Sequence, residues 1–116
     1  MNLTSQILAI VLIAVCLVTA VADFRRVESI MATMERLKVP ANAVPLLGSI
    51  KVVAAIGMAV GLVVERLGQV TGVALAAYFA IAVTTHVRVK DGVANTLPAF
   101  VLLVSSLLFV LTSIAA

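Results

Sequence analysis

Charge, aromatic residues and cysteine are all scarce in this sequence of 116 residues. Charged residues make up 11% and aromatic residues 4%, tryptophan is absent, and Cys16 is the only cysteine. A single cysteine excludes an internal disulfide and a thiol relay, and inside an apolar run we expect it to pack as a small hydrophobic side chain. With one cysteine and one histidine, a single chain cannot assemble a zinc site. A haem with two axial histidines would likewise need a partner chain.

Hydrophobic residues dominate instead, at 64% of the chain with a mean hydropathy of +1.29. Soluble domains are about half apolar and a quarter charged, and a short soluble chain could not bury this much apolar surface. Lipid is therefore the expected solvent. A transmembrane helix takes about 20 residues, so the length admits four spans with short connections. We expect one integral membrane domain over residues 1–116, with no room for a second domain.

The apolar runs predict an all-α fold, a bundle of four transmembrane helices. The predicted spans cover residues 5–22, 44–64, 67–86 and 95–115. The first run could be mistaken for a secretory signal, since Ala20-Val21-Ala22 resembles a signal-peptidase site. Its start carries no Lys or Arg, whereas a secretory signal has a basic start. We expect this run to be retained as a membrane helix.

A polar stretch separates the first two predicted spans. Its apolar residues recur at spacings of three and four: Phe24, Val27, Met31, Met34 and Leu37. This period places them on one face of a helix, with the charged residues opposite. We predict a short amphipathic helix over residues 24–38, lying in the membrane interface and ended by Pro40. A simple solvated loop is the alternative.

Lys and Arg are concentrated in the first and third connections between spans. These connections carry Arg25, Arg26, Arg36, Lys38, Arg88 and Lys90. The second connection and the two ends carry only Arg66. The positive-inside rule then places the first and third connections in the cytoplasm and both termini outside, in a bacterial inner membrane. Because the cations lie between apolar runs, the net charge of +3 points to membrane topology and not to nucleic acid.

Small residues favour close packing of the second and third spans. Gly57 and Gly61 on one span, and Gly68 and Gly72 on the next, form small-xxx-small patterns beside a very short turn. Such residues let membrane helices approach closely. We predict a tightly packed hairpin; the competing interpretation is that glycine and alanine are simply common in membrane helices.

Lys51 is a charge inside a predicted span, about 10 Å from the start of that helix. An intramembrane lysine costs about 2.5–3.5 kcal/mol on insertion scales. It could extend to the interface, pair with Asp91 or a glutamate and so fix helix register, or form a cationic floor that binds an anion or a polar headgroup. His86, Arg88, Lys90 and Asp91 lie at the same predicted end, as do Glu28 and Glu35 of the predicted short helix, and His86 could handle protons. Tyr78, deeper in the third span, could line such a pocket or simply pack.

Two short motifs resemble those of the small DoxX-like membrane proteins: Pro45-x-x-Gly48-x-x-Lys51, which opens the second span, and His86-x-Arg88-x-x-Asp91, which follows the alanine-rich third span. The similarity covers nearly the whole chain, most clearly residues 39–98. The resemblance implies a four-span fold and, by position, a functional cluster of Lys51, His86, Arg88 and Asp91. The founding members are small subunits associated with quinone-linked oxidation of sulfur compounds, so it also implies a quinone as ligand. Many DoxX relatives have a glutamate where this chain has Lys51.

Several functions fit these observations. The first is binding of a quinone or another lipophilic ligand at the cytoplasm-facing polar cluster, linked to a redox pathway. The second is an accessory subunit of a larger membrane complex, or a homo-oligomer; the third is a small membrane enzyme, an isomerase or hydrolase with a lipophilic substrate. A small multidrug transporter is disfavoured because the predicted first span carries no carboxylate to exchange protons. We expect the bilayer as a partner in every case.

Overall fold

The computed structural model describes residues 2–115, in which five α-helices and one 3₁₀ helix occur and no strand. The elements are α1 (Leu3–Phe24), α2 (Glu28–Arg36), η1 (Ala41–Ala43), α3 (Val44–Gly61), α4 (Glu65–Arg88) and α5 (Val93–Ala115). The helices α1, α4, α5 and the stretch Ala41–Gly61 are each long and apolar enough to cross a membrane. The predicted fold class, an all-α bundle with four apolar helices and a short helix between the first two, is confirmed.

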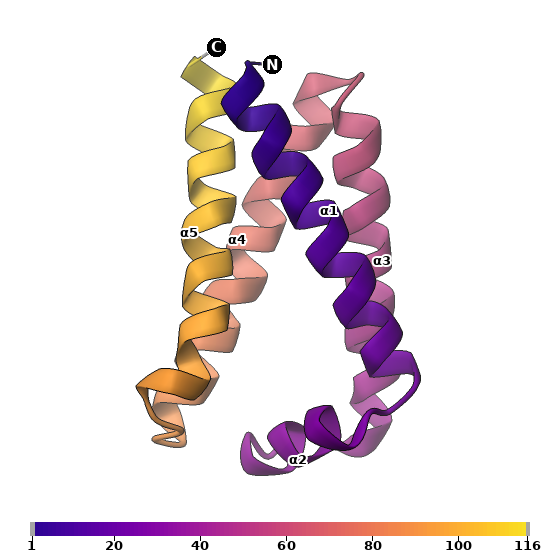
Figure 1. Cartoon of the computed structure of the whole chain (residues 1–116), viewed down its shortest axis with the longest axis vertical. Coiled ribbons are helices and arrows are strands. Elements are labelled where there is room, and N and C mark those ends of the chain that lie inside the picture. Colours follow the sequence, from indigo (N-terminus) through magenta and orange to yellow (C-terminus); the bar gives the residue numbers. More distant parts are fainter. Residues whose placement is uncertain (1, 116) are drawn as a thin grey trace.

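The four long helices run up and down, and α2 lies across one end of the bundle (Figure 1). The most extensive contacts join α1 to α3 and α4 to α5, while α3–α4 and α1–α5 contacts close the ring. We call the end that carries α2, the start of α3 and the turn between α4 and α5 the α2 end. The other end carries the turn between α3 and α4, and there Asn2 Nδ2 donates a hydrogen bond to the Thr112 carbonyl at 3.2 Å.

Three helices end in the same way, with a basic residue in the left-handed conformation. Arg26, Lys38 and Lys90 follow α1, α2 and α4 with φ angles of 51°, 60° and 55°. The next backbone N–H reaches back into the last helical turn each time, for example from Val39 to Met34 at 2.9 Å. Glycine usually occupies this position. The turn at Arg26 explains why α2 begins only at Glu28 and is shorter than the predicted helix over 24–38.

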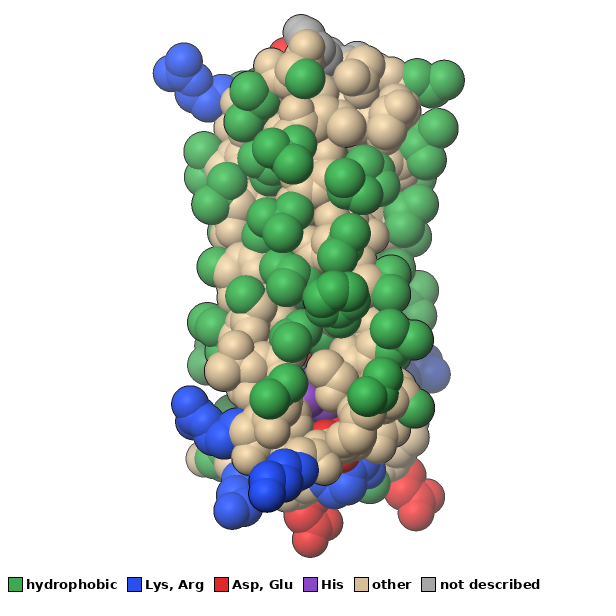
Figure 2. Space-filling view, turned by 90° about the vertical axis from the view of Figure 1, so that its left-hand side faces the viewer, with side chains coloured by type: hydrophobic (Ala, Val, Ile, Leu, Met, Phe, Trp, Pro, Cys, Tyr) green, Lys and Arg blue, Asp and Glu red, His purple; other side chains and the backbone are tan. Residues whose placement is uncertain are grey.

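A compact apolar core lies between the long helices. Leu12, Met58, Phe79 and Phe109 are buried there, one from each of the four. Cys16 is 1% exposed within the same core, which confirms that it packs as a hydrophobic side chain. Most other large apolar side chains face outward: Figure 2 shows them covering the shaft of the bundle, with basic side chains gathered at the α2 end. This distribution suits a molecule whose sides are solvated by lipid.

The predicted hairpin is confirmed next to the turn but not along its whole length. A methyl group on Gly61 would overlap the backbone of Gly68, so α3 and α4 touch main chain to main chain there. Gly72 faces α5 instead, where an added Cβ would lie 2.8 Å from Phe109 and Val110. Gly72, although part of the small-residue pattern, therefore serves the contact with α5 and not the hairpin, because α4 turns successive small residues toward different neighbours.

Candidate functional site

A buried ion pair joins α1 to α3 near the α2 end. Lys51 Nζ donates to Asp23 Oδ2 at 2.9 Å, with Lys51 13% and Asp23 0% exposed. Gly48 allows this approach, since a Cβ at that position would lie 3.2 Å from the Asp23 Cβ. The prediction that Lys51 would meet Asp91 or a glutamate is wrong, because α1 places a nearer carboxylate beside it. The other oxygen, Asp23 Oδ1, has no hydrogen-bond donor among the described residues.

Asp23 was not predicted as a site residue, because the first span was predicted to end just before it. The first span was predicted to end at residue 22, whereas α1 continues to Phe24 and buries Asp23. The first long helix therefore does carry a carboxylate, contrary to the premise that disfavoured a small multidrug transporter. That carboxylate is neutralised by Lys51. A lysine inside a span often pairs with an acidic residue, and the aspartate that borders the preceding span was the available signal.

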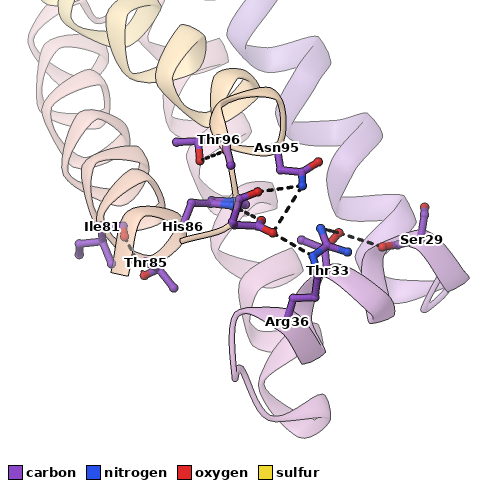
Figure 3. Close-up of polar contacts among 10 residues, drawn as sticks. Ser29, Thr33, Arg36, Ile81, Thr85, His86, Asn95 and Thr96 are labelled. Atoms are coloured by element: carbon purple, nitrogen blue, oxygen red, sulfur yellow. Dashed lines mark hydrogen bonds and ion pairs between the residues drawn. The ribbon is translucent and has the colours of Figure 1, made fainter. Parts of the chain in front are cut away.

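Asp91 forms a second polar group, which we call the Asp91 cluster (Arg36, His86, Asp91 and Asn95). Arg36 Nε lies 3.0 Å from Asp91 Oδ1, and His86 Nδ1 lies 2.7 Å from Oδ2. Asn95 Nδ2 donates to the Asp91 carbonyl at 2.9 Å. Figure 3 shows Arg36, His86 and Asn95 converging from α2, α4 and α5. One aspartate therefore connects three helices.

The Asp91 cluster keeps its carboxylate ionised. The Arg36 guanidinium, hydrogen-bonded to Asp91, holds the pKa of that carboxyl below its ordinary value. Desolvation acts in the opposite direction, and the hydrogen bond with His86 adds to the lowering. Because a carboxylate attracts a guanidinium only while it is ionised, this charge keeps the end of α2 against the turn between α4 and α5.

An open cavity of about 530 Å³ lies beside the Asp91 cluster, between the end of α2 and the end of α4. We call it the basic cavity. Its lining consists of four cationic side chains and three others: Arg36, Lys38, Arg88, Lys90, Leu37, Thr85 and Val89. No carboxylate is among them. Lys38, Arg88 and Lys90 form no salt bridge within residues 2–115, so no carboxylate there pairs directly with their charges.

The five residues predicted to form one site are thus divided among the buried ion pair, the Asp91 cluster, the basic cavity and the edge of the apolar core. Lys51 lies in the buried pair, His86 and Asp91 in the Asp91 cluster, and Arg88 in the basic cavity. Tyr78 packs edge-on against Phe79, with ring centroids 5.3 Å apart. No hydrogen bond or ion pair in the described part of the chain joins the buried pair to the Asp91 cluster. Arg36 and Lys38, which also line the basic cavity, were expected only to set the orientation in the membrane, whereas Lys90 was expected near the polar groups but not as a ligand-binding residue.

A metal-based site has no support in this arrangement: across residues 2–115, no three His, Cys, Asp or Glu side chains gather as a metal-ion site would require. The polar groups at the α2 end are instead suited to hydrogen bonding and charge pairing. Four apolar helices with these groups at one end define a small multi-pass membrane protein.

Comparison with known proteins specifies the family. The chain matches the DoxX-like family over residues 7–109, and it therefore belongs to that family. No curated protein and no solved structure shows a significant match to it. The resemblance based on the two short motifs is confirmed, because the matched range includes both of them.

Proposed function

We propose that this DoxX-like protein binds a lipophilic ligand by its polar headgroup in the basic cavity. The observation that carries the proposal is the cavity itself: about 530 Å³, lined by four cationic side chains from two segments far apart in the sequence. Ligand pockets typically range from about 300 to 1,000 Å³ and hold a few converging polar groups. The basic cavity lies within that range of volumes and brings several polar groups together, although its lining is more basic than that of most such pockets.

The position of the cavity suits a ligand that is partly dissolved in lipid. Leu37 and Val89 line it together with the cations, so its wall is both polar and apolar. The long helices beside it expose mainly hydrophobic side chains. A headgroup in the cavity would therefore leave its hydrocarbon tail against the apolar side of the bundle.

A quinone is one such ligand, and it is the one that the DoxX-like resemblance implies, together with a link to a redox pathway. Its carbonyl oxygens accept hydrogen bonds, and Arg and Lys side chains are donors without acceptor atoms. Arg88, like Lys38 and Lys90, is exposed at the cavity and forms no salt bridge within residues 2–115, so its guanidinium is free to donate to a headgroup.

The orientation of the protein forms part of the proposal. Six Lys and Arg residues lie in the first and third connections, against Arg66 alone on the other side. By the positive-inside rule the α2 end, and with it the basic cavity, faces the cytoplasm of a bacterial cell. The ligand would then be received from the inner leaflet, whether the protein acts as a single chain, a homo-oligomer or a subunit of a complex.

Photo-crosslinking with a quinone analogue tests this function. The protein in lipid nanodiscs is irradiated with a photoreactive quinone, and modified peptides are located by mass spectrometry. We expect labelling in residues 36–38 and 85–90, reduced at least severalfold by Arg88→Gln. Arg66→Gln is the matched control, because Arg66 is an exposed arginine at the opposite end of the same helix. Labelling spread along the helices, or unchanged by Arg88→Gln, would contradict the proposal.

A further inference from the structure

The charge of the basic cavity restricts the kind of headgroup that it can hold. Arg36, Lys38, Arg88 and Lys90 bring four positive charges to one cavity, and only Arg36 has a carboxylate partner, Asp91. Like charges held close together repel one another. A neutral headgroup would satisfy hydrogen bonds but would leave this repulsion in place, whereas an anion would remove it.

Membrane orientation alone does not explain this arrangement. The positive-inside rule requires cations on one side of the membrane but not in one place. Arg25 and Arg26 also lie at the α2 end, yet they do not line the cavity. The four cations that do line it come from the ends of α2 and α4, which the Asp91 cluster holds together. The convergence is therefore a product of the tertiary fold.

We propose that the basic cavity binds a phosphate group. This inference rests on the proposed function, since it names the headgroup held in the same cavity. Arg88 supplies a planar guanidinium group that can pair with phosphate oxygens in a two-point contact, and Lys38 and Lys90 supply compact charges. Arg36, whose Nε is bonded to Asp91, adds positive charge to the same cavity. Leu37 and Val89 provide apolar contact for whatever carries the phosphate.

Binding of lipids that differ only in the headgroup tests the inference. The probes are phosphatidic acid, which ends in a phosphate monoester, and phosphatidylcholine with the same acyl chains, measured by native mass spectrometry of the detergent-solubilised protein. We expect phosphatidic acid to bind at least tenfold more tightly. Each cavity cation that is neutralised should weaken this binding about fivefold. The variants are Arg88→Gln and Lys90→Gly, with Arg66→Gln as the control that changes nothing.

Lys90→Gly still tests phosphate binding if Arg88→Gln folds poorly. Lys90 has a φ of 55°, a conformation that glycine adopts without strain, so this variant removes a charge while it favours the native turn. Competition with inorganic pyrophosphate separates two sources of phosphate. Displacement of phosphatidic acid supports a soluble phosphate compound as occupant, and its failure to displace supports a lipid headgroup.

Equal affinities for the two lipids, unchanged in Arg88→Gln and Lys90→Gly, would overturn the phosphate inference. If quinone labelling of the cavity were still lost in Arg88→Gln, the proposed function would stand with a neutral headgroup. If neither lipid binding nor quinone labelling depended on Arg88, both proposals would fail.

Discussion

Removing Lys51 should leave a buried carboxylate without a partner. In Lys51→Met the side chain keeps its length, but Asp23 loses its hydrogen-bond donor; Oδ1 already has none in the described residues and the side chain is 0% exposed. Breaking a buried ion pair on one side costs about 3–5 kcal/mol in soluble proteins. Polar contacts contribute less in membranes, because the unfolded helices also find partners there. We therefore expect Lys51→Met to lower the free energy of unfolding by about 2–4 kcal/mol.

The double variant Asp23→Ala/Lys51→Met separates this cause from lost packing. It removes both charges, and replacement of a buried ion pair by apolar residues is often nearly neutral. We expect it to recover at least half of the loss, measured by unfolding in mixed dodecylsulfate micelles with circular dichroism. Lys38→Met, an exposed lysine without a salt bridge in residues 2–115, is the control and should change stability by less than about 0.5 kcal/mol. A double variant as unstable as Lys51→Met would refute the reasoning.

Three further predictions concern packing, pH and orientation. Gly61→Ala should destabilise the fold by about 1–3 kcal/mol, because the added methyl group would overlap the Gly68 backbone. Gly68→Ala should cost less, since its Cβ would lie 3.1 Å from the Gly61 Cα. The opposite order in the same unfolding assay would contradict this packing. Because the pKa of Asp91 is held below its ordinary value of 3.8, its contribution to stability is present above that pH and is lost as the pH falls through the lowered value. Spin labels on α2 and α5 should accordingly move apart in strong acid, and in Asp91→Asn at neutral pH; a distance that stays fixed would exclude this role. In intact bacteria, a membrane-impermeant thiol reagent should modify Arg66→Cys but not Glu35→Cys, and the reverse would invert the orientation.

The four long helices could be predicted from the sequence because bilayer thickness sets the length of an apolar run. The ends of these helices were harder to predict, since a helix can include a buried charged residue when an oppositely charged side chain lies beside it. Asp23 is the example: the composition assigned it to a connection, while its contact with Lys51 draws it into α1. The turn at Arg26 could not be predicted either. Glycine at this position would have indicated a left-handed conformation, whereas arginine does not.

The candidate site could be predicted only in part. His86 and Asp91 are five residues apart across a helix end, so their pairing is local and within reach of sequence reasoning. The basic cavity joins the end of α2 to the end of α4, and only the packing of the whole bundle brings those ends together. Arg36 and Lys38 therefore indicated orientation, but gave no indication of a shared cavity.

The ring of helices also has a consequence for how the protein is made. Its two most extensive interfaces, α1 with α3 and α4 with α5, each lie within one half of the chain. The first half can complete its interface, including the Asp23–Lys51 pair, before α4 leaves the ribosome. The second half contacts the first through Gly61 and Gly68 and through α5 against α1, so we expect it to dock there. We therefore expect the protein to assemble from two helix pairs, so that the two halves, divided between α3 and α4 and expressed as separate polypeptides, should reassemble in the membrane.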